Sequence, residues 1–139
     1  MGLLGSIFTA TRDEAFANDG GVSLMADRKF PLQRLTDVDF KQAYKSCTGR
    51  SIARTAGEPF AHDEGYEQVT VVLDPDLVAW LATLNTESIK AAARLIAPSE
   101  QNVRGGPSED EWAEILTGVQ PVAALAIHAS QDVYMWMSL

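Results

Sequence analysis

Between Gln68 and Leu84 the chain changes from the pattern of a strand to that of a helix. Residues 68–73 read QVTVVL, and this run of β-branched residues favours a strand that is buried on both faces. Asp74 and Pro75 follow at once, as an N-cap and a first-turn proline. The next apolar residues recur at the spacing of one helix face: Leu77, Trp80, Leu81 and Leu84. The fold must therefore combine a sheet with helices.

Further helices are marked by the residues that begin and end them. We expect them over Asp37–Cys47 with Gly49 beyond the end, between a Thr86 cap and Pro98, and from Ser108 to about Gly118. The clearest signal for a helix N-terminus is the capping box formed by Ser108 and Glu111. Thr11 and Glu14 could cap a further, short helix.

The strands are less sharply defined. Leu3–Thr9 is apolar and predicts a first strand, whereas Val22–Met25 is a weaker candidate and Phe30-Pro31 is expected to break the element that follows. Val122–Ala129 could be helical from its alanines. The aromatic and β-branched residues after it favour a terminal hairpin that turns through residues 130–132.

These elements predict a single α+β domain over residues 1–139, with a small, mainly antiparallel sheet packed against three or four short helices. The chain is 46% hydrophobic and 22% charged, which is typical of a globular protein. Because Cys47 is the only cysteine and cannot form an internal disulfide, we expect a cytoplasmic location. No apolar run approaches the roughly 20 residues that span a membrane, so we expect no membrane partner. Gly2 fits a loose myristoylation pattern, but an apolar first strand explains the same residues.

Negative charge is concentrated after residue 54. Residues 55–139 contain thirteen acidic and three basic residues, a net charge of −10, whereas the first 54 residues are slightly basic. A field of this sign repels nucleic acid and attracts basic proteins. We therefore expect a protein partner with a basic surface and no direct contact with nucleic acid.

One group of carboxylates lies in a long loop expected over residues 51–66. His62, Asp63 and Glu64 are adjacent there, with Glu58 and Glu67 nearby. Such a group could move protons or bind a metal. It lacks the defined ligand spacing of known metal sites, so a solvated acidic loop is the preferred interpretation and we assign no metal or catalytic residue.

A second group lies at the start of the helix predicted from Ser108. Its members are Glu109, Asp110, Glu111 and Glu114. Acidic residues stabilise a helix N-terminus through its dipole, which accounts for three of them without a partner. Together with the loop carboxylates they could still form an extended negative surface.

The remaining candidates have structural explanations. His128 is expected to be a core histidine and Cys47 a packing residue near a helix end, where the dipole would raise its pKa. The glycine pairs lack the spacing of phosphate-binding loops, so no cofactor is expected.

We therefore expect an acidic protein-binding module, such as an inhibitor or immunity protein that neutralises a basic partner. Its binding residues would be Glu58, Asp63, Glu64, Glu67, Glu109, Asp110, Glu111 and Glu114. Two alternatives stay open at this point: a small enzyme that uses the loop carboxylates and His62, with or without a metal, and a structural protein that oligomerises.

Overall fold

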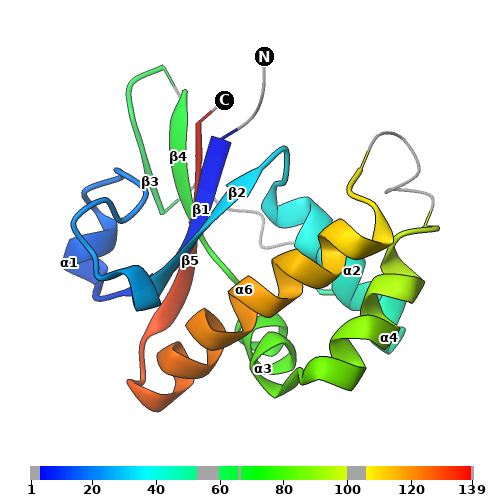
Figure 1. The fold of residues 1–139 in the computed structure, drawn as a ribbon. Helices are drawn as coiled ribbons and strands as arrows, with labels where there is room; N and C mark the ends of the chain where they lie inside the picture. The colour runs from blue at the N-terminus through cyan, green and yellow to red at the C-terminus, as the bar shows by residue number, and fades with distance from the viewer. Residues whose placement is uncertain (1–3, 53–59, 66, 100–105, 139) are drawn as a thin grey trace.

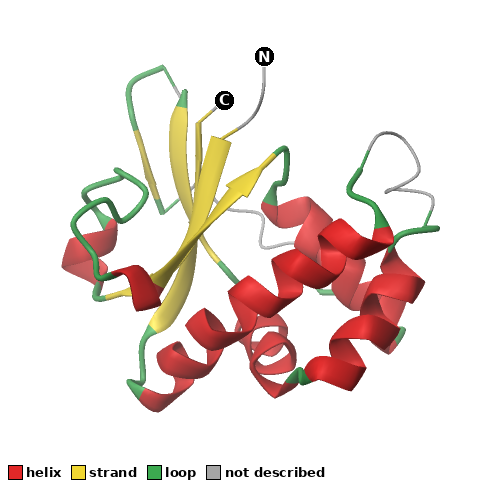
Figure 2. Ribbon diagram, viewed as in Figure 1, coloured by secondary structure: helices red, strands yellow, loops and turns green. Residues whose placement is uncertain are grey.

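Five strands form one antiparallel sheet in the order β2-β1-β5-β4-β3 (Figures 1 and 2). The computed structural model describes residues 4–52, 60–65, 67–99 and 106–138. The strands are β1 (Leu4–Ala10), β2 (Lys29–Gln33), β3 (Ala61–His62), β4 (Gln68–Val72) and β5 (Asp132–Ser138). The sheet and the helices beside it confirm the predicted α+β class.

Most of the helices gather on one side of the sheet. Their bounds are α2 (Asp37–Thr48), α3 (Pro75–Thr83), α4 (Thr86–Ile96) and α6 (Glu109–His128). Of these four, α6 lies against β1, β2 and β5, whereas α3 and α4 pack against α6 (Figure 1). The short helix α1 (Arg12–Ala15) lies on the other side of the sheet, and the 3-10 turn η1 (Ala26–Arg28) precedes β2. α6 therefore lies between the sheet and the helices α3 and α4.

The two central strands are buried on both faces. Ile7 and Met135 belong to the large core shared with the helices, whereas their neighbours Phe8 and Tyr134 belong to a second cluster on the opposite face. Successive side chains along a strand point to opposite faces of the sheet, so a sheet covered on both faces has a separate cluster of buried residues on each face. In β4 the expected double burial is only partly present, because Val72 remains 42% exposed.

The helix caps follow the sequence signals closely. Asp39 accepts a hydrogen bond from the backbone N–H of Thr36 at 2.8 Å, and Asp74 accepts one from that of Asp76 at 2.8 Å. Gly49 ends α2 with φ of 74°, a conformation that favours glycine. The expected Thr86 cap is wrong by one residue, because Asn85 accepts from the backbone N–H of Ser88.

The predicted terminal hairpin is wrong. Residues 122–128 continue α6, which passes through Gly118 and Pro121 before it ends at His128. The continuation buries one face of the helix against the core, and this burial outweighs the local signals that stop a helix. Its buried residues after Gly118 are Val119, Val122, Ala123 and Ala126. A single strand, β5, then follows in place of two.

Two expectations near the N-terminus are also wrong. Residues 22–25 form turns and not a strand. Phe30 and Pro31 lie inside β2, where Pro31 is opposite Ser6 of β1. A proline has no N–H for a sheet ladder, and it is tolerated here because β2 is an edge strand.

Glu14 connects α1 to η1. Its carboxylate accepts from Arg28 Nη2 at 2.7 Å and Nη1 at 3.3 Å, and from the backbone N–H of Thr11. The hydrogen bond with Arg28, followed by that with Thr11, lowers the pKa of Glu14 from 4.5 to about 2. Because the folded pKa lies below the unfolded value, this carboxylate favours folding at pH above 4.5, and the contribution is lost as the pH falls towards 2.

Glu14→Gln is therefore expected to destabilise the protein at neutral pH but not near pH 2. The measurement is urea denaturation of both proteins across that range. Asp13→Asn is the matched control, because it removes a charge from the same turn and leaves the Glu14–Arg28 pair in place. A stability difference between wild type and Glu14→Gln that did not change with pH would contradict the expectation.

Candidate acidic binding site beside α6

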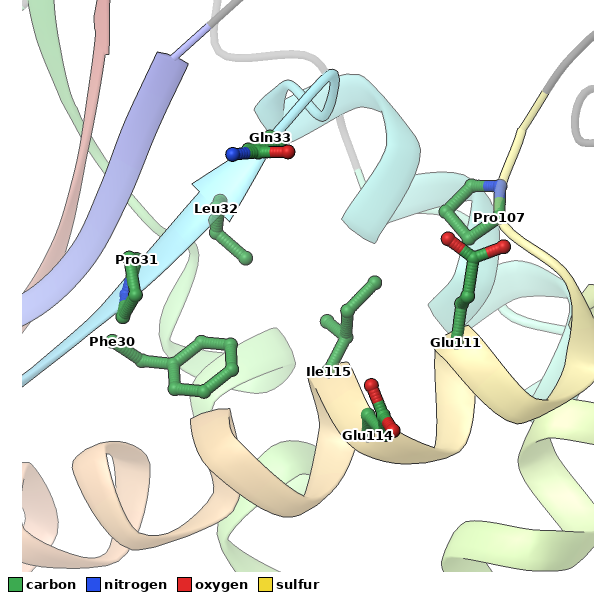
Figure 3. A pocket seen from close by; sticks show the side chains of 8 residues that line it. All are labelled: Phe30, Pro31, Leu32, Gln33, Pro107, Glu111, Glu114 and Ile115. Atoms are coloured by element: carbon green, nitrogen blue, oxygen red, sulfur yellow. The ribbon is translucent and has the colours of Figure 1, made fainter.

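A small pocket lies where the edge strand β2 meets the first half of α6 (Figure 3). Its volume is about 180 Å³. The strand contributes Phe30, Pro31, Leu32 and Gln33, and the helix side contributes Pro107, Glu111, Glu114 and Ile115. The Phe30 and Ile115 side chains project from the two elements into the space between them. The pocket is thus mainly apolar, with two carboxylates on its helix side.

Gly118 lets Phe30, one of the residues that line this pocket, pack closely against α6. A Cβ atom at this position would overlap with the ring of Phe30, so the missing side chain is what lets the ring lie directly on α6. Ile115 is one turn away on the same stripe of the helix, and Glu111 is one turn further. The glycine that was expected to end the helix therefore serves as a contact point for β2.

The four carboxylates predicted at the helix start are all exposed, but they do not have the same surroundings. Glu111 closes the capping box, because its Oε1 accepts from the backbone N–H of Ser108 at 3.2 Å. Glu109 and Asp110 lie with it in the first turn, where the helix dipole stabilises them. Glu114 lies one turn further along, outside the cap and at the pocket.

One of the loop carboxylates, Asp63, has a structural role. Asp63 Oδ1 accepts from the backbone N–H groups of Glu67 at 2.8 Å and Gln68 at 3.2 Å, which fixes the turn from β3 to β4. Glu64 and Glu67 are exposed at this turn, and β3 itself lies inside the segment expected to be a loop.

The two acidic groups lie at opposite edges of the sheet. The turn that carries Glu64 follows β3, whereas the pocket with Glu114 adjoins β2, and these two strands end the sheet order. The expected single extended surface is therefore not formed by the described carboxylates. Glu58 and the candidate acylation site Gly2 lie outside the described residues.

The histidines and the cysteine occupy other parts of the fold. His62 is exposed on β3, with Nδ1 2.7 Å from the carbonyl oxygen of Asp63. His128 is exposed in the last turn of α6, so its expected place in the core is wrong. Cys47 is half-buried, and burial raises its pKa to about 11, in the direction expected but for a different cause. Within the described ranges no group of three or more His, Cys, Asp or Glu side chains could hold a metal ion.

The pocket residues from β2 were missed by sequence reasoning. Residues 29–33 read KFPLQ, in which Phe30 and Leu32 alternate with exposed positions as in a half-buried strand. Pro31 predicts a break in the chain, but a proline is also compatible with an edge strand. This alternation is the sequence signal that predicts a strand here with one face buried.

In the described part of the chain, no helix is both long and apolar enough to cross a membrane. Comparisons with known proteins found no matching family model, no matching curated protein and no matching solved structure. The candidate function must therefore be argued from the chemistry of the site.

Proposed function

We propose that this protein is a binding module that holds a basic segment of a protein partner against the first two turns of α6. The observation that carries the proposal is the position of Glu114, an exposed carboxylate outside the helix cap and beside an apolar pocket. A charged rim around an apolar centre is the usual arrangement of a protein interface.

The charge of the chain supports a basic partner. The net charge is −8 overall and −10 over residues 55–139. Such a field raises the rate of association with a basic protein and disfavours nucleic acid. An inhibitor or immunity protein that neutralises a basic partner fits this chemistry. Because Cys47 is the only cysteine, we place this activity in the cytoplasm.

The proposal is tested with a variant that neutralises α6 but keeps its cap. The changes are Glu109→Gln, Asp110→Asn and Glu114→Gln, which leave the Ser108–Glu111 box intact. The control neutralises three exposed acids elsewhere: Asp76→Asn, Glu87→Gln and Asp132→Asn. A third variant, Glu64→Gln with Glu67→Gln, tests the turn after β3.

Each protein is immobilised and used to capture partners from a lysate of the native host, followed by a wash in about 500 mM salt. The partner is identified by mass spectrometry, purified and titrated against all variants. We expect the α6 variant to bind at least about tenfold more weakly, a loss of about 1.4 kcal/mol, and the control to stay close to wild type. Equal binding by the α6 variant, or binding that salt does not weaken, would overturn the proposal.

A further inference from the structure

The pocket beside α6 has the dimensions of a site for one side chain. At about 180 Å³ it is smaller than the roughly 300–1,000 Å³ of a pocket for a drug-sized ligand, so it suits one side chain better than a helix or strand of a partner. Its walls are Phe30, Pro31, Leu32 and Ile115, and its charged groups are Glu111 and Glu114. A side chain that fits both the apolar walls and the carboxylates has an apolar stem and a positively charged end.

Lysine and arginine both have this form, but the pocket distinguishes them. A lysine ammonium is compact and strongly hydrated, so apolar walls around it carry a large desolvation cost. A guanidinium is planar and weakly hydrated, stacks on aromatic rings and pairs with a carboxylate through two hydrogen bonds. The half-buried ring of Phe30 and the exposed carboxylate of Glu114 offer these two contacts within one pocket.

We propose that the pocket between β2 and α6 receives a single arginine side chain of the protein partner. This inference rests on the proposed function and adds to it the residue that the partner inserts. Glu114 pairs with the guanidinium, the Phe30 ring lies against its face, and Ile115 and Leu32 contact the aliphatic stem. Glu111 keeps its role in the helix cap and adds negative charge at the rim.

The test uses two short peptides that differ at one residue, Gly-Ser-Arg-Ser-Gly and Gly-Ser-Lys-Ser-Gly. Each is titrated into the isotope-labelled full chain while amide chemical shifts are followed by NMR. We expect the arginine peptide to shift the amides of Phe30, Leu32, Glu114 and Ile115. We also expect it to bind roughly fivefold more tightly than the lysine peptide, the size of one exposed cation–π contact.

Two variants test whether Glu114 and Phe30 cause the preference for the arginine peptide over the lysine peptide. Glu114→Gln should weaken the arginine peptide several-fold, whereas Glu87→Gln, which removes an exposed acid from α4, should not. Phe30→Leu keeps an apolar side chain and removes the ring, so it should abolish the preference for arginine and leave lysine binding unchanged. Should Phe30→Leu fail to give a folded spectrum, the Glu114→Gln comparison decides alone.

Failure of this inference is distinguishable from failure of the proposed function. Equal binding of the two peptides, or shifts away from the pocket, removes the arginine site. In that case the proposed binding of a basic partner at α6 is still supported if partner capture depends on the α6 carboxylates. If partner capture does not depend on the α6 carboxylates, the proposed function is contradicted. The inference that the partner inserts an arginine is then contradicted as well.

Discussion

Trp112→Ala is expected to lower the free energy of unfolding by about 3–5 kcal/mol, the range for truncating a large buried aromatic residue. Trp112 is 1% exposed in the first half of α6. Its ring meets that of Phe40 in α2 edge to face, with centroids 5.9 Å apart and an interplanar angle of 83°. The substitution therefore removes a contact between two helices as well as buried area, and it leaves a cavity at the centre of the core.

Trp80→Ala is the matched control for this prediction. Trp80 has a similar edge-to-face contact, with Tyr44 at 5.7 Å and 78°, but its side chain is only half-buried. We expect a clearly smaller loss, measured by urea denaturation of both variants. Should Trp112→Ala prove unfolded, Trp112→Phe gives a smaller and measurable loss. A cost for Trp80→Ala as large as that for Trp112→Ala would contradict the assigned burial.

Gly118→Ala is expected to destabilise the protein although alanine is the better helix former. The new methyl group would overlap with the Phe30 ring, and overpacking of this kind costs about 1–3 kcal/mol. The gain in helix propensity is about 1 kcal/mol. We therefore expect a net loss of up to about 2 kcal/mol by urea denaturation, together with a displaced Phe30.

The sign of this effect should reverse when the ring is absent. In a Phe30→Ala background there is no ring to overlap, so Gly118→Ala should stabilise the protein by about 1 kcal/mol through helix propensity alone. The double-mutant cycle thus separates propensity from packing at one residue. Stabilisation by Gly118→Ala in the wild-type background would show that Phe30 does not lie on the helix.

Gly118 also shows why the sequence predicted the start of α6 correctly and its end incorrectly. Ser108 and Glu111 act within one turn, so their capping box can be recognised locally. Gly118 and Pro121 are equally local signals, and both favour a helix end. Here the burial of Val119 and the residues after it outweighs them, and that burial depends on strands distant in the sequence.

The candidate site also has one part that local sequence signals predict and one part that depends on distant contacts. Its carboxylates could be predicted, because acidic residues at a helix start form a visible cluster. The apolar half of the pocket could not, because β2 and α6 are separated by more than 70 residues in the chain and meet only in the fold. The described carboxylates of the two acidic groups lie at opposite edges of the sheet, and charge counts do not reveal which edge each group occupies.

The pairing of β1 with β5 has a consequence for how the chain reaches this fold. These two strands lie side by side at the centre of the sheet, with Leu4 opposite Ser138, and β1 has only β2 as a partner until residues 132–138 are available. Contacts between distant parts of a chain slow folding, because the loop must close before they stabilise anything. During synthesis the helices can form first, while the central pairing waits until β5 has been made. The sheet should therefore close after the helices have formed, and more slowly than they do.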